Sequence, residues 1–214
     1  IECSEIVIFI INDNVIEKRL LFSSSKIKIM KKLSLSVCLV LLFFGNVFAE
    51  STERNNKLNQ LFNQLKKSND VSIALEIEMK IWNIWSTHPT QEKLTSSLAI
   101  GSELMSRGEL DSAYKIFSII IESDPDWAEG WNKRATVLYL MGKYLDSLND
   151  IDEVLKRESR HFGAFSGQAL VQIKLKNYEK AIKSYQAAQK IYPSIRSAET
   201  MIPQLQELIK EEVI

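Results

Sequence analysis

The sequence has few of the residues that mark several protein classes. Its 214 residues include only two cysteines, four prolines and seven glycines. So few cysteines exclude a disulfide-rich scaffold, and the glycine and proline counts exclude collagen-like and low-complexity chains. An excess of one charge is also absent, since 27 basic residues balance 27 acidic ones. This balance argues against nucleic acid as a partner and against an acidic disordered tail.

Long hydrophobic runs are also scarce, and the clearest one lies near the amino end. A basic start at 30–32, an apolar run at 37–44 and the small residue Ala49 predict a secretory signal peptide at 30–49. Cleavage after Ala49 would leave Glu50 as the first residue. The apolar run is shorter than the roughly 20 residues of a membrane span. We therefore expect a periplasmic or secreted protein of a Gram-negative bacterium, with no stable membrane span after cleavage.

Residues 1–29 do not suit a position before a signal peptide, which acts from the amino terminus. We interpret them as a non-native upstream extension and expect translation to start at Met30. Both cysteines, Cys3 and Cys38, lie before the predicted cleavage site. The mature chain would therefore have neither thiol chemistry nor a disulfide bond.

The rest of the chain repeats with a period of 34 residues. Three units in register, 94–127, 128–161 and 162–195, carry matching residue types, and such a period indicates a repeat architecture. The aligned sets are Ser97, Trp131 and Phe165; Gly101, Ala135 and Ala169; Leu110, Tyr144 and Tyr178; Ala113, Ser147 and Ala181; and Phe117, Ile151 and Tyr185. The small residues allow paired helices to approach closely.

These units resemble the tetratricopeptide repeat (TPR), whose pattern is W-x2-L-G-x2-Y, then A-x3-F, then P. The segment 127–136 is similar to that of small secreted TPR proteins of alphaproteobacteria. The resemblance implies an all-α fold: a right-handed superhelix, or α-solenoid, of antiparallel helix pairs with capping helices. Residues 50–93 are expected to form a degenerate helical hairpin and linker that cap the amino end, and 196–214 a carboxyl-terminal capping helix. Pro203 predicts a kink or a late start in that last helix.

Residues at the turns and in the helices carry more local expectations. Gly108 and Gly142 stand where the first helix of a unit must stop, which favours a left-handed backbone. Lys176 replaces the third such glycine, and we expect Asn177 to take over the unusual dihedral. Arg134 stands at a usual leucine site and is expected to pair with Asp150 or Asp152. Trp127 and Trp131 are interpreted as packing residues rather than binding residues.

No catalytic constellation stands out, so we expect neither an enzyme nor a cofactor nor a metal site. His88 and His161 lack metal-ligand spacing. His161 is interpreted as a solvated loop residue that starts a helix, with a binding role as the alternative. Glu122-Ser123 matches a pair used by some peptidoglycan-cleaving enzymes, but it stands at a helix end without their other motifs.

The expected function is that of a non-catalytic periplasmic TPR adaptor or scaffold, which binds a protein or peptide partner in its concave groove. The alternative is a self-associating structural module of the envelope, and a peptidoglycan-acting enzyme comes third. Asn132-Lys133-Arg134 faintly resembles a carboxylate-binding clamp but does not supply the full set. By repeat position, the resemblance implies a groove formed by Leu98, Ser102, Met105, Asn132, Lys133, Thr136, Tyr139, Ser166, Leu170 and Ile173.

Overall fold

The computed structural model describes residues 52–68 and 70–212, and all regular secondary structure in these two ranges is α-helical. The predicted extension at 1–29 and the predicted signal peptide, with Ala49 and Glu50, lie outside the described residues. Within the described ranges no helix combines the length and the hydropathy needed to cross a bilayer.

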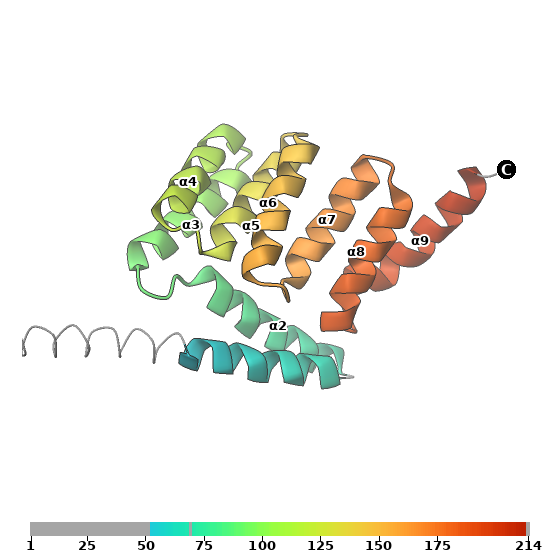
Figure 1. The fold of residues 1–214 in the computed structure, drawn as a ribbon, viewed down its shortest axis with the longest axis horizontal. Helices are drawn as coiled ribbons and strands as arrows, with labels where there is room; N and C mark the ends of the chain where they lie inside the picture. The colour runs from blue at the N-terminus through green and yellow to red at the C-terminus, as the bar shows by residue number, and fades with distance from the viewer. Residues whose placement is uncertain (1–51, 69, 213–214) are drawn as a thin grey trace, which may run out of the picture. The chain divides into compact units, whose positions relative to one another are not determined.

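Three antiparallel helix pairs follow one another along the chain and lie side by side in chain order (Figure 1). Each of the three 34-residue units holds one pair. The pairs are α3 (Glu92–Ser106) with α4 (Leu110–Ser123), α5 (Ala128–Leu140) with α6 (Tyr144–Arg157), and α7 (Phe162–Lys174) with α8 (Tyr178–Ile191). The predicted all-α fold of helix pairs is confirmed.

The small residues of the repeat permit close contact between the helices. Gly101 of α3 faces the Phe117 ring of α4, and a Cβ at Gly101 would lie only 2.6 Å from that ring. Ala113 and Phe117 are both fully buried. A larger residue at 101 would push the two helices apart, so the aligned small position sets the spacing within the pair.

The turns between paired helices share one backbone geometry. Gly108 and Gly142 have φ of 78° and 74°, as expected for a left-handed helix end. Lys176 itself has φ 58° and Asn177 has φ −93°, so the expectation that Asn177 takes the unusual dihedral is wrong. The reason is the hydrogen-bond register: the Asn177 amide donates to the Gln172 carbonyl at 2.8 Å, as Lys143 does to Leu138. This register places the left-handed residue at 176 whatever its side chain.

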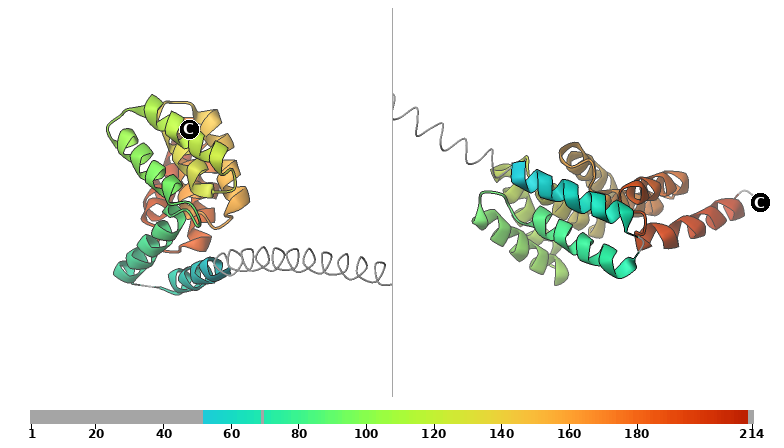
Figure 2. Two further views of the ribbon diagram at one scale, coloured as in Figure 1. Left: turned by 90° about the vertical axis from the view of Figure 1, so that its left-hand side faces the viewer. Right: turned by 90° about the horizontal axis from the view of Figure 1, so that it is seen from below.

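The amino-terminal hairpin consists of a helical segment at 52–67 and α2 (Val71–Ser86). The Asp70 carboxylate caps α2 by accepting the amides of Ser72 and Ile73. The hairpin crosses the ends of the repeat helices along one edge of the array (Figures 1 and 2).

The aromatic side chains of this amino-terminal hairpin pack against the third repeat. Phe62 and Trp85 of the hairpin contact Phe162 at ring-centroid distances of 6.5 and 5.2 Å. Phe162 also contacts Tyr192 at the end of α8. Large aromatic side chains therefore fill the junction between the hairpin and the third repeat.

The last helix, α9 (Arg196–Glu212), packs on α8 and buries Ala198 and Leu205. It begins seven residues before Pro203 and continues through it. The expectation of a late start is therefore wrong. Since proline has no amide hydrogen, the helix lacks the hydrogen bond that residue 203 would donate.

Candidate partner-binding site

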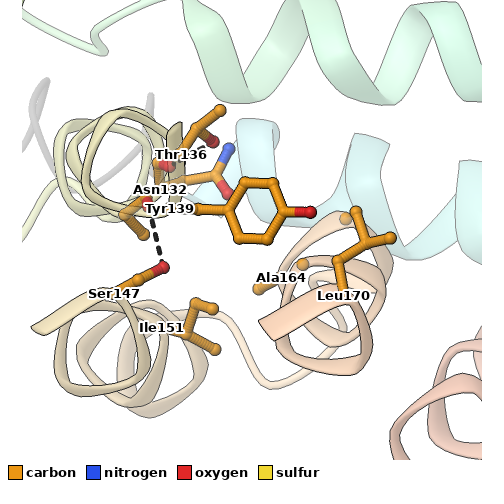
Figure 3. Close-up of a pocket in the computed structure, with 10 residues that line it drawn as sticks. Asn132, Thr136, Tyr139, Ser147, Ile151, Ala164 and Leu170 are labelled. Atoms are coloured by element: carbon orange, nitrogen blue, oxygen red, sulfur yellow. Dashed lines mark hydrogen bonds between the residues drawn. The ribbon is translucent and has the colours of Figure 1, made fainter. Parts of the chain in front are cut away.

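A small pocket lies between α5 and α7, with α6 at its base (Figure 3). It encloses about 80 Å³. Its lining residues are Asn132, Ala135, Thr136, Tyr139, Ser147, Ile151, Gly163, Ala164, Gly167 and Leu170. None of these ten residues carries a charge, and most of the surface that they present is apolar.

Two helices form the walls of the pocket, and the spacing of the lining residues places them on one face of each helix. Asn132, Thr136 and Tyr139 follow one another at intervals of four and three residues on α5, and therefore share one face. Gly163, Gly167 and Leu170 repeat these intervals on α7. In Figure 3 the Tyr139 ring extends from α5 toward Leu170, so it spans the space between the two helices.

The base of the pocket is fixed by a buried hydrogen bond. The Ser147 hydroxyl of α6 donates to the Ala135 carbonyl of α5 at 2.8 Å, and both residues are buried. Ile151, one turn further along α6, supplies an aliphatic surface. A hydroxyl thus stands where the repeat usually has alanine, and it ties α6 to α5 at the pocket.

A buried carboxylate lies next to this pocket, at the start of α5. Glu129 is 1% exposed and accepts hydrogen bonds from Asn132 Nδ2 at 3.1 Å and from His161 Nε2 at 3.3 Å. Lys133 Nζ lies 3.4 Å from its other oxygen. Burial alone would raise the pKa of Glu129, but the hydrogen bond from His161, together with Lys133 and Asn132, holds that pKa below its ordinary value. Glu129 is therefore a structural anion.

His161 links this carboxylate to α7 and to the hairpin. Its Nδ1 accepts the Ala164 amide at 3.0 Å, so the ring proton resides on Nε2 and faces Glu129. The imidazole starts α7, as predicted, but its exposure is 0%, and the prediction of a solvated residue is wrong. The reason is the hairpin: the indole of Trp85 lies on one face of the ring.

The hairpin also packs against Gly163, one of the residues that line the pocket. A Cβ added to Gly163 would lie 2.5 Å from the Trp82 ring. Glycine at 163 therefore allows α2 to approach α7 directly. Trp82 is oriented by a hydrogen bond from its Nε1 to Glu78 at 3.1 Å.

Both cationic side chains that follow Asn132 are paired with carboxylates. Lys133 lies against Glu129, and Arg134 donates two hydrogen bonds, of 2.7 and 2.8 Å, to the buried Asp150. The predicted pairing of Arg134 is confirmed, with Asp150 as the partner. Hydrogen bonding to Asp150 raises the pKa of Arg134 above its usual value.

The two tryptophans of this region are packing residues, as predicted. Trp127 is 6% exposed and donates to the Trp85 carbonyl at 3.0 Å. The guanidinium groups of Arg134 and Arg157 lie over the Trp131 ring, at 5.0 and 4.9 Å from its centroid.

The structure brings four of the ten predicted groove residues to the pocket: Asn132, Thr136, Tyr139 and Leu170. The predicted residues of the first repeat do not line the pocket. Leu98 is 3% exposed and belongs to the core between α3 and α4, and Met105 packs against the same core. Ser102 donates to the Leu98 carbonyl.

The remaining predicted residues also lie away from the pocket. Lys133 faces Glu129, and Ile173 packs on the core shared by α7, α8 and the hairpin. Ser166 donates to the Phe162 carbonyl and lies 3.4 Å from the Ser197 hydroxyl.

Sequence reasoning missed the small residues and the α6 residues of the lining. Gly163 and Gly167 are four residues apart within one helix. Two glycines with this spacing indicate that another segment of the chain packs closely against that face of the helix. Ser147 and Ile151 belong to second helices, which the repeat pattern assigns to packing. Among residues 52–68 and 70–212, no three His, Cys, Asp or Glu side chains gather to hold a metal ion.

Comparisons with known proteins agree with this architecture. The tetratricopeptide repeat family model matches residues 164–195. A TPR repeat-containing protein of Rhizobium etli is 32% identical over 157 residues, which span 73% of this chain and 76% of that protein.

Solved structures with a similar fold include two TPR domains. The Sgt2 TPR domain from Aspergillus fumigatus has a TM-score of 0.54 at 14% identity, covering 57% of this chain and 82% of that chain. The first TPR of Spaghetti, bound to an HSP90 peptide, has a TM-score of 0.53 at 17% identity, covering 56% and 94%. At these identities the likeness shows the fold alone.

Proposed function

The chain belongs to the tetratricopeptide repeat family, and from this premise we propose that it is a non-catalytic adaptor that binds a segment of a partner protein. The observation that carries the proposal is the uncharged pocket between α5 and α7. First helices of adjacent repeats form its walls, and a pocket of this kind takes a side chain of a bound peptide. The peptide complex of the similar Spaghetti domain supports the same type of partner.

We place this adaptor in the periplasm of a Gram-negative bacterium, on the strength of the signal-peptide pattern at 30–49. Fractionation of cells that express the native gene, followed by intact-mass measurement, tests this proposal. We expect a periplasmic protein that begins at Glu50. A mature chain that begins upstream of Met30 would overturn it.

A matched pair of variants tests the binding site. Leu170 lines the pocket and is 41% exposed, whereas Leu145 is 68% exposed on α6 and does not line it. Leu170→Arg puts a charge at the pocket mouth, and Leu145→Arg puts the same charge elsewhere. Crosslinking in envelope extracts, read by mass spectrometry, should show partners that are lost with Leu170→Arg and kept with Leu145→Arg. Equal partner sets would remove the pocket from the proposal.

Self-association is the second candidate, and one observation favours it. The first helix pair leaves Ile100 and Ile119 more than half exposed, since the hairpin lies at a different edge. Exposed aliphatic residues at the end of a repeat array can pack on another copy. Size-exclusion chromatography with light scattering should then show a dimer that Ile100→Ser converts to a monomer. A strict monomer at high concentration contradicts this candidate.

A further inference from the structure

The size of the pocket restricts what it can hold. Ligand pockets for small molecules have volumes of about 300–1,000 Å³, and this one encloses about 80 Å³. That volume suits one aliphatic side chain and is too small for a cofactor-sized molecule.

Three polar side chains at the pocket already have hydrogen-bond partners within the protein. Thr136 donates its hydroxyl hydrogen to the Asn132 carbonyl at 3.0 Å, and Ser147 donates to the Ala135 carbonyl. The Asn132 amide group donates to Glu129. A carboxylate placed here would need several donors that are free to turn toward it. These three donors already have partners, which leaves the Tyr139 hydroxyl as a donor at the pocket and falls short of a carboxylate-binding set.

The neighbouring cations are already paired with carboxylates of the protein. Lys133 neutralises Glu129, and the guanidinium of Arg134 forms a two-bond pair with Asp150. Turning either cation toward a ligand would leave a buried carboxylate without its partner, which is strongly unfavourable. The site therefore lacks the electrostatics for an anionic terminus.

An apolar stripe leads away from the pocket along α2. Val71, Leu75, Met79 and Trp82 are spaced at intervals of four, four and three residues, and so lie on one flank of the helix. Trp82 packs against Gly163, a lining residue of the pocket, while Val71, Leu75 and Met79 are 43%, 39% and 63% exposed. Apolar residues of a partner can therefore continue from the pocket onto this flank.

We infer that the pocket selects an internal, uncharged stretch of a partner, which inserts one aliphatic side chain, and that it does not recognise a terminal carboxylate. This inference rests on the proposed function and adds the chemistry of the partner. The contact between Trp82 and Gly163 places α2 next to the pocket.

A peptide array in two chemical forms tests this inference. Every 12-residue peptide is displayed once with a free carboxyl terminus and once with a carboxamide, and bound protein is quantified at 50 and 500 mM salt. We expect the same aliphatic-containing peptides to bind in both forms, with affinities that differ less than twofold between the salt concentrations. A need for the free carboxylate, or a steep loss of binding with salt, would overturn the inference and leave the proposed function intact.

A pocket variant and a control complete the experiment. A Cβ at Gly167 would meet only Ile151 at 3.8 Å, so Gly167→Ala narrows the pocket without a clash. We expect at least a fivefold weaker affinity for the selected peptides. Ser112→Ala, on an exposed part of α4, should leave the affinity unchanged. Unchanged affinity in Gly167→Ala would show that the peptides bind elsewhere, and an array with no bound peptide in either form would refute the proposed function itself.

Discussion

The indole of Trp85 stacks on the imidazole of His161, with ring centroids 4.1 Å apart and ring planes 8° apart. Trp85 comes from the amino-terminal hairpin, and His161 stands between the second and third repeats. The stack therefore joins two segments that the repeat pattern treats as independent. It also explains why a histidine at a helix start is fully buried.

Replacement of Trp85 should destabilise the protein strongly. Trp85→Ala removes a side chain that is 5% exposed and leaves a cavity over His161. Loss of a buried tryptophan costs about 3–5 kcal/mol. Urea unfolding followed by circular dichroism measures the change. Leu145→Ala, at a largely exposed site, is the control, and equal unfolding free energies for both variants would contradict the prediction.

Two glycines of one helix should respond in opposite ways to alanine. At Gly163 the new methyl group collides with Trp82, so Gly163→Ala should cost about 1–3 kcal/mol. At Gly167 the nearest atom is at 3.8 Å, so Gly167→Ala should stabilise the helix by up to about 1 kcal/mol.

Thermal unfolding of both variants provides the measurement. Adding Trp82→Ala to Gly163→Ala should cost less than the two single changes together, because the collision is then absent. Strict additivity would show that the two residues do not meet.

Removal of Arg134 should be costly because its partner is buried. Arg134→Ala leaves Asp150, which is 4% exposed, without its two hydrogen bonds. Such a loss costs about 3–5 kcal/mol. The double change Arg134→Met with Asp150→Leu should recover most of it. Arg107→Ala breaks an exposed pair with Glu103 and should cost less than ~1 kcal/mol. Denaturant unfolding decides between these outcomes.

Glu129 should make the protein sensitive to acid. Its pKa in the folded state lies below the ordinary value of a glutamate, because of its hydrogen bonds and the charge of Lys133. The stabilisation is therefore complete above the unfolded-state pKa of about 4.3, and it is lost as the pH falls through the lower folded-state pKa. In Glu129→Gln the unfolding free energy should fall less steeply below about pH 5. Glu103→Gln, at an exposed site, should follow the wild type, and parallel curves for all three proteins would contradict this role.

The repeat fold was predictable because the residues that specify each helix pair lie close together in sequence and recur in every unit. Gly108 and Gly142 mark the turns, and Ala113 and Phe117 mark the contact between paired helices. The dihedral at Lys176 was not predictable from its residue type, since the turn register overrides the residue preference there. Position in the repeat carries more information than the side chain at this turn.

The candidate site was predictable only where it follows the repeat. Thr136 and Tyr139 line the pocket as their repeat positions imply. Leu98 does not, because the core of the first pair takes up its side chain. The docking of Trp82 on Gly163 depends on a contact across more than 80 positions, and no local pattern encodes it.

The docking of the hairpin also bears on how the chain folds. In an ordinary solenoid each repeat contacts only its neighbours, so folding can start anywhere and spread. Here Arg160 donates to the Asn59 side chain at 2.6 Å, a contact that spans 101 positions. Such contacts raise the contact order and slow the search for the native state. The hairpin should therefore be the last part to dock, in a kinetic phase that a chain starting at α3 does not show.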